Sequence, residues 1–325
     1  MGEKMIRLNN YLYGLFQKSG LALLIIIIGV LFAVLTKGMF ISGQNISNIL
    51  VSSSLTGIVG IGMTFVLITG GIDLSVSGNV VMTSLIMATW MSIGIPWLLA
   101  IAMAICVSTM VGLINGISIG RFGMVAFVVT LAVSNITRGY GKLFSGGQTV
   151  YGLPEIHEIF GLGKLFGIIP APIIMVGIVA IVASFVLNYT NYGRKLYAVG
   201  GNQKAAWMAG IKTTKIIVSA YVISGLLCGF GAVLITSKLM SASSTIASNL
   251  ELDAIAACVI GGTSLSGGSG RISGTVLGAI AIAMIANGLN LTGVSPFAQE
   301  IAKGVIIFVV VAIDAYQKRK KVKNS

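Results

Sequence analysis

The polar side chains that could do chemistry inside this chain lie beside pairs of glycines. In "GGIDLSVSGN", residues 70–79, Asp73 and Ser75 follow one glycine pair, and in "GGTSLSGGSG", residues 261–270, Thr263 follows another. Paired glycines weaken a helix and free backbone N–H and C=O groups, which apolar surroundings tolerate only where the irregular chain is buried or lines a water-filled space. The two stretches therefore predict a polar route or gate between helices, with these three side chains as candidate groups.

Helix packing and helix capping are the alternatives for the same residues. The chain has 43 glycines, and small residues let membrane helices approach closely. Asp73 stands where it can cap the helix that follows. Because acidic groups near lipid are costly, the sequence favours a functional or structural polar role for Asp73 over an incidental one.

Nucleophiles and metal ligands are too scattered to form a catalytic set. His157 is the only histidine, and Cys106, Cys228 and Cys258 stand apart in apolar runs without a CxxC motif. The glycine-rich "GGSGRISG", residues 267–274, lacks the Lys and the preceding strand of a phosphate-binding loop. We therefore expect no catalytic residue, metal or cofactor on this chain, and we expect that it is not an enzyme.

A basic loop in the middle of the chain carries a second candidate site. In "YAVGGNQKAAWMAGIKTTK", residues 197–215, Gly200 and Gly201 allow a turn, Asn202 is a good N-cap and Gly210 fits a helix stop. The predicted helix has about two turns, whereas isolated helices need roughly 12–15 residues to be stable in water. The helix must therefore be stabilised by packing against another surface.

The loop has no acidic residue near its basic ones, which are Arg194, Lys195, Lys204, Lys212 and Lys215. We interpret the predicted helix as a docking element for a cytoplasmic partner or for the protein's own inner surface. An amphipathic helix on lipid headgroups is the alternative, although an apolar face made mostly of alanine binds lipid poorly.

Composition places the chain in a membrane. Apolar residues make up 56% of the 325 residues and charged residues 9%, and the mean hydropathy is +0.99. A bilayer core of roughly 30 Å needs about 20 apolar helical residues per crossing. Ten stretches qualify, with nine or eleven also compatible: 20–36, 46–70, 76–94, 96–119, 123–141, 168–188, 216–236, 251–265, 272–290 and 297–315.

The distribution of charge orients these spans. Lys and Arg collect in cytoplasmic loops, and most of the 21 basic residues fall near the two termini and in the central loop. We therefore expect both termini and that loop to be cytoplasmic, with the first apolar run kept as a span and not cleaved as a signal peptide. The net charge of +13 suits anionic lipid headgroups, so the lipid bilayer is the expected partner and nucleic acid is not.

Four stretches in the same order resemble one family across about residues 45 to 315. They are "GGIDLSVSG", "YGRKLYAVGGNQKAAWMAGI", "ELDAIAACVIGGTSLSGGSGRISGTVLGA" and "NGLNLTGV". Together they resemble the membrane permease of bacterial ribose-type ABC importers, which also serve galactose, xylose and related sugars. The resemblance implies an all-α, multi-pass protein of the bacterial cytoplasmic (inner) membrane, with one permease domain over 1–325 and a cytoplasmic coupling loop at about 192–215.

The resemblance also implies the partners. Such a permease works with a second permease copy, a cytoplasmic ATP-binding subunit that holds ATP and Mg, and an extracytoplasmic sugar-binding protein. It translocates a small sugar, ribose or a related monosaccharide, by alternating access. The residues implied in coupling to the ATPase are Arg194, Gly200, Gly201, Asn202, Ala205, Ala206 and Gly210. Trp207 is bulkier than the resemblance leads us to expect at its position.

Further polar residues in apolar spans are candidates for the sugar pathway. Thr130, Asn135 and Asn287 offer donors and acceptors without strong charge, as sugar hydroxyls require, but each could equally hydrogen-bond a neighbouring helix. The competing functional class is an ion-coupled secondary sugar transporter, which typically needs ionisable groups near the middle of the bilayer. The acidic residues of this chain fall near predicted span ends or in loops, which favours the importer.

Overall fold

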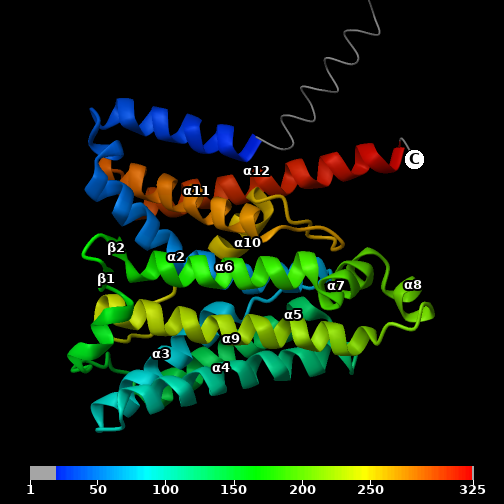
Figure 1. The fold of residues 1–325 in the computed structure, drawn as a ribbon, viewed down its shortest axis with the longest axis horizontal. Helices are drawn as coiled ribbons and strands as arrows, with labels where there is room; N and C mark the ends of the chain where they lie inside the picture. Colours follow the sequence, from blue (N-terminus) through cyan, green and yellow to red (C-terminus); the bar gives the residue numbers. More distant parts are fainter. Residues whose placement is uncertain (1–19, 324–325) are drawn as a thin grey trace, which may run out of the picture.

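The computed structural model describes residues 20–323, and helices dominate it (Figure 1). The longer helices are Gly20–Leu35, α2 (Gly43–Ile68), α3 (Val76–Ser92), α4 (Trp97–Gly120), α5 (Ala126–Phe144), α6 (Ala171–Tyr189), α9 (Thr213–Leu239), α10 (Leu250–Ile260), α11 (Ile272–Leu291) and α12 (Pro296–Lys323). The short elements are η1 (Met39–Ile41), η2 (Glu155–Phe160), the antiparallel pair β1 (Lys164–Leu165) and β2 (Ile169–Pro170), α7 (Asn191–Gly201) and α8 (Gln203–Met208).

The predicted helical fold is confirmed in the described part of the chain. Each of the ten predicted segments overlaps one of the longer helices. Five of the described helices, α2, α4, α6, α9 and α11, are long and apolar enough to cross a membrane. The predicted span 251–265 contains only the 11-residue α10, because the chain leaves the helix at the glycine pair that follows Ile260, where Gly262 has a positive φ of 86°.

α2, α3 and α9 form the centre of the bundle, and 14 of the 17 residues of α3 are buried. In their most apolar stretches, 78% of α2 and 67% of α9 are buried, against 28% of α4 and 17% of α6. Figure 1 shows the helix Gly20–Leu35 at one edge of the bundle and α4 at the opposite edge. Helices that are apolar all round but mostly exposed suit a lipid environment, so α4 and α6 present the surface that lipid would cover.

The contact between α4 and α9 requires glycine. A Cβ atom on Gly112 would overlap the carbonyl oxygen of Tyr221, and a Cβ atom on Gly225 would lie 2.6 Å from the carbonyl oxygen of Ser108. Ser108 Oγ donates a hydrogen bond of 2.6 Å to the carbonyl oxygen of Gly225. Close backbone approach of this kind holds membrane helices together where no hydrophobic driving force acts between them.

The two ends of the bundle differ. Figure 1 shows α7, α8 and the C-terminal end of α12 at one end, and β1 and β2 at the other. Beside β1, the imidazole of His157 in η2 is fully buried, with no hydrogen-bond partner among the described residues. Burial lowers the pKa of His157 to about 4, so the ring is neutral at ordinary pH and packs against Phe160, with ring centroids 6.0 Å apart.

Replacing Gly225 with alanine tests the close contact of α4 and α9. We expect Gly225→Ala to cost about 1–3 kcal/mol of stability, because the added methyl group forces the two backbones apart. In Gly177→Ala on α6, the new Cβ meets nothing within 4 Å, so only the better helix propensity of alanine acts. Thermal unfolding of both variants in detergent measures the difference, and equal midpoints would contradict this account of the packing.

Candidate functional site

Asp73 lies in the connection between α2 and α3, beside the middle of α9. Its Oδ2 accepts a hydrogen bond of 2.8 Å from Ser224 Oγ, and Ser224 is near the centre of α9. Its Oδ1 accepts from the backbone N–H of Ser75 at 3.0 Å and from Ser75 Oγ at 2.5 Å. The sequence placed Asp73 near the inner end of a span, whereas the structure embeds its connection among the helices, with Asp73 only 2% exposed.

Further hydrogen bonds tie this connection to three helices. Asn115 Nδ2 of α4 donates to Ser75 Oγ at 2.7 Å. Ile72 O accepts from Tyr221 Oη of α9 at 3.3 Å and lies 3.4 Å from Thr130 Oγ1 of α5. We call the set Asp73, Ser75, Asn115 and Ser224 the Asp73 cluster. It links the start of α3 to α4 and α9 through side chains that are all buried.

Hydrogen bonds, and no cationic side chain, stabilise the Asp73 carboxyl group. Among the side chains that the structure describes, the ion pair Lys303–Asp253, 3.0 Å between α12 and α10, is the single salt bridge. Asp73 also lies at the N-terminal end of α3, where the helix dipole favours negative charge. The N-cap of α3 is Ser75, and the Asp73 carboxyl group instead joins the α2–α3 connection to α9.

The remaining pathway candidates lie apart from this cluster. Asn287 exchanges two hydrogen bonds of 2.9 Å with Asn45, which joins α11 to α2, so helix packing accounts for its amide. Asn135 is exposed on α5 and makes no hydrogen bond with the described residues. Thr263 is 1% exposed, and its Oγ1 has no partner in the described part of the chain. Of the six candidates, the structure brings together Asp73, Ser75 and Thr130.

Sequence reasoning missed Ser224 and Asn115. Both are polar residues in apolar spans, the same signal that selected Thr130, Asn135 and Asn287. A polar residue in an apolar span marks a candidate, but it does not predict which helices face each other. Among the side chains described by the structure, no group of three His, Cys, Asp or Glu could hold a metal ion.

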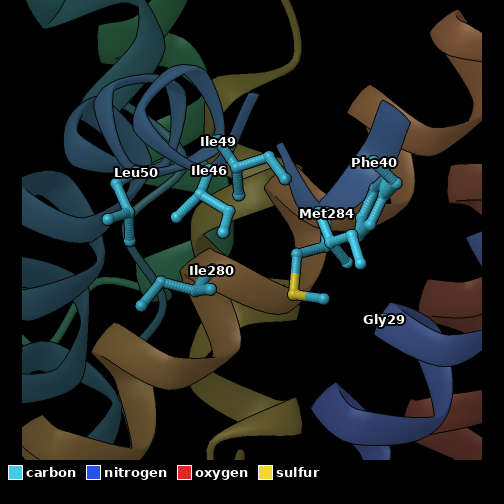
Figure 2. Close-up of a pocket in the computed structure, with 8 residues that line it drawn as sticks. Gly29, Phe40, Ile46, Ile49, Leu50, Ile280 and Met284 are labelled. Carbon is cyan, nitrogen blue, oxygen red and sulfur yellow. The ribbon is translucent and has the colours of Figure 1, made fainter. Parts of the chain in front are cut away.

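A pocket at the edge of the bundle is not a sugar site. It has a volume of about 230 Å³ and lies between the helix Gly20–Leu35, the start of α2 and α11 (Figure 2). Its lining is entirely apolar in side-chain type: Gly29, Phe40, Ile41, Ile46, Ile49, Leu50, Ile280 and Met284. Because a sugar needs several hydrogen-bond donors and acceptors, this cavity cannot select one.

The predicted two-turn helix of the basic loop is present as α8. Asn202 Oδ1 accepts a hydrogen bond of 2.9 Å from the N–H of Ala205, and Gly210 has a positive φ of 82° after the helix ends. Both local predictions, the N-cap and the stop, are confirmed. Trp207 and Met208 are 67% and 73% exposed, and Figure 1 shows α8 projecting from its end of the bundle.

One other expectation about this loop is corrected. Gly200 and Gly201 do not form a turn, because they end α7, an 11-residue helix that the sequence did not predict. Gly200 is needed instead for contact, since a Cβ atom there would overlap the carbonyl oxygen of Ile68. Ala206 is only 5% exposed and packs on its own chain. Arg194 hydrogen-bonds Asn191 within α7.

Removing the Ser224 hydroxyl tests the link between Asp73 and α9. We expect Ser224→Ala to lower stability by about 1–3 kcal/mol, because one oxygen of a buried carboxyl group loses its donor. The control is Ser184→Ala on α6, where the half-buried hydroxyl makes no hydrogen bond with described residues. Thermal unfolding in detergent reports both. A Ser224→Ala variant as stable as the control would show that the link contributes nothing.

Comparisons with known proteins place this geometry in a family. The ribose import permease protein RbsC of Bacillus subtilis (strain 168) is 40% identical over 96% of this chain and 96% of its own length. The D-allose transport system permease protein AlsC of Escherichia coli (strain K12) is 34% identical over 92% of each chain. The L-arabinose ABC transporter permease protein AraH of Azospirillum brasilense is 32% identical over 97% of this chain and 92% of its own. No solved structure was found to match.

The family described as "Branched-chain amino acid transport system / permease component" matches residues 45–313. This range runs from the first turn of α2 into α12 and includes both the Asp73 cluster and α8. The match and the apolar helices agree on a multi-pass protein of the inner membrane. The chain therefore belongs to this family of membrane transport permeases, and the likeness to ribose-type import permeases expected from its motifs is confirmed.

Proposed function

We propose that this chain is the permease subunit of an ATP-driven importer that moves ribose or a related monosaccharide across the bacterial cytoplasmic membrane by alternating access. The observation that carries the proposal is the sequence identity of 40% with a ribose import permease over 96% of both chains. The family description names a different cargo, and relatives over similar lengths are named for allose and arabinose. Ribose is proposed because its permease shares the highest identity among the relatives described above.

The partner that supplies energy docks on α8 in this proposal. The helix is short, capped and exposed, and it carries two large apolar side chains, Trp207 and Met208, with Lys204 and Lys212 exposed beside them. Trp is among the residues that most often dominate binding energy. A cytoplasmic ATP-binding subunit that holds ATP and Mg²⁺ suits this surface, because the chain itself has no phosphate-binding loop.

The proposed orientation has ten spans with both termini in the cytoplasm. The end of the molecule that carries α7, α8 and the C-terminal end of α12 is then the cytoplasmic end (Figure 1). The basic residues of the central loop and of the C-terminal sequence gather at that end, in line with the excess of Lys and Arg in cytoplasmic loops. The sugar-binding protein docks at the opposite end, where Phe166 and Ile168 are 85% and 79% exposed between β1 and β2.

A second copy of the chain completes the sugar pathway. On α5, the exposed residues Leu131, Ala132, Asn135 and Gly139 form a stripe, and the Asn135 amide there has no hydrogen-bond partner among the described residues. An unpaired amide facing hydrocarbon is costly, so this stripe suits a second copy or the sugar better than lipid. We therefore propose that two α5 helices face each other across the pathway.

The ion-coupled alternative has less support. Asp73 is the acidic group beside the helix centres, and its two oxygens already accept three hydrogen bonds from Ser75 and Ser224. A coupling carboxyl group must release or bind its ion during each cycle. The Asp73 cluster serves as a structural link in this proposal.

Uptake into vesicles tests the proposed function. We expect vesicles that contain this chain, its ATP-binding subunit and the sugar-binding protein to take up labelled ribose only when ATP is present. Allose, arabinose and galactose, offered with the same binding protein, measure selectivity. Uptake by the chain alone under a proton gradient would contradict the importer and support the ion-coupled transporter.

Replacing Trp207 with alanine tests the docking surface. Loss of a central Trp from an interface typically costs 2 kcal/mol or more, so we expect Trp207→Ala to weaken binding of the ATP-binding subunit by at least about 30-fold. Phe166→Ala is the matched control, a large exposed side chain at the opposite end. Co-purification and titration of the subunit measure both. Equal affinities for the two variants would exclude α8 as the docking element.

A further inference from the structure

The ends of α2 and α7 meet the loop between α10 and α11, and the contacts are made by backbone. The N–H of Gly268 donates a hydrogen bond of 2.9 Å to the carbonyl oxygen of Ile68. A Cβ atom on Gly200 would overlap that same oxygen, and a Cβ atom on Gly267 would lie 2.8 Å from Gly200 O and 2.9 Å from Gly70 N. We call the contact of residues 68–71, 200–201 and 267–268 the glycine junction.

A side chain reinforces the junction from α7. Tyr197 Oη donates a hydrogen bond of 2.8 Å to the carbonyl oxygen of Gly270. A Cβ atom on Gly270 would lie 2.9 Å from the side chain of Ile68 and 3.0 Å from that of Thr263. α7, the helix that precedes α8, therefore contacts the α10–α11 loop at two points, Gly200 and Tyr197.

On its other side, the junction leads directly into the Asp73 cluster. Gly71 packs against the hydroxyl group of Tyr221, which hydrogen-bonds the next residue, Ile72, at 3.3 Å. Asp73 follows and joins Ser224 of α9. At Gly200 and Gly267 backbone packs on backbone, and close-packed interiors transmit strain.

We propose that the glycine junction carries movement of α7 and α8 to the α2–α3 connection and to the α10–α11 loop at the same time. This inference rests on the proposed docking of an ATPase at α8 and adds which parts of the permease receive the motion. The two glycine-paired stretches that contain Asp73 and Thr263 then move together, because both rest on the end of α7. Static packing, in which the junction only holds α7 in place, is the competing account.

Two glycines provide the test. In Gly200→Ala the new Cβ overlaps the carbonyl oxygen of Ile68, whereas in Gly177→Ala on α6 it meets nothing within 4 Å. Both glycines lie in helices, α7 and α6, and Gly177 is outside the glycine junction. In vesicles that contain the whole importer, sugar molecules moved per ATP hydrolysed are measured, which is independent of how much complex assembles.

We expect Gly200→Ala to lower this ratio by about tenfold, a typical size for coupling between sites, while Gly177→Ala keeps the wild-type ratio. A Gly200→Ala ratio equal to that of Gly177→Ala would overturn the proposal in favour of static packing. Absence of ATP-driven uptake by the wild-type complex would instead contradict the proposed function, so the two failures are distinguishable.

A milder variant decides the question if Gly200→Ala does not assemble. Tyr197→Phe keeps the ring and removes only the hydrogen bond to Gly270. Its control is Tyr189→Phe, because the Tyr189 side chain of α6 is exposed. We expect a lower ratio of sugar moved to ATP hydrolysed for Tyr197→Phe and an unchanged ratio for Tyr189→Phe. Equal ratios in these two variants would overturn the proposal.

Discussion

A chain that leaves the helical conformation inside an apolar bundle must find partners for its backbone groups within the protein, since lipid offers none. The connection between α2 and α3 meets this constraint with groups from several elements. The carbonyl oxygen of Ile68 accepts from Gly268, that of Ile72 from Tyr221, and the N–H of Ser75 donates to Asp73. The conformation of this connection therefore depends on the α10–α11 loop and on α9, and the positions of those elements depend on it.

Local signals let the sequence predict α8, and distant contacts explain why it did not predict the rest of the loop. Asn202 and Gly210 act on their own neighbours, so the start and stop of the helix follow from residue type and spacing. Gly200 allows close contact with the end of α2, more than 130 positions earlier in the chain, and only the folded structure provides that neighbour. A glycine that permits contact and a glycine that permits a turn look the same in sequence.

Polar residues in apolar spans illustrate the same limit. Asn135 and Asn287 satisfied one criterion, yet Asn287 pairs with Asn45 and Asn135 faces outward. Ser224 satisfied it too and became the partner of Asp73. Serine in a helix can always hydrogen-bond a carbonyl group of its own preceding turn, so its type alone does not predict a tertiary contact. The ten helical segments were predictable because apolar length is a property of each segment alone.

The two sites differ in what they leave free for a partner. In α8, the buried Ala206 holds the helix to its own chain while Trp207 and Met208 point outward, so the loop offers apolar surface on a fixed support. In the Asp73 cluster, the carboxyl oxygens and the Ser75 hydroxyl are already used by one another and by Asn115. A sugar could bind these groups only by breaking the contacts that hold α3 to α9. Selection among sugars therefore fits a separate binding protein better than it fits the interior of this chain.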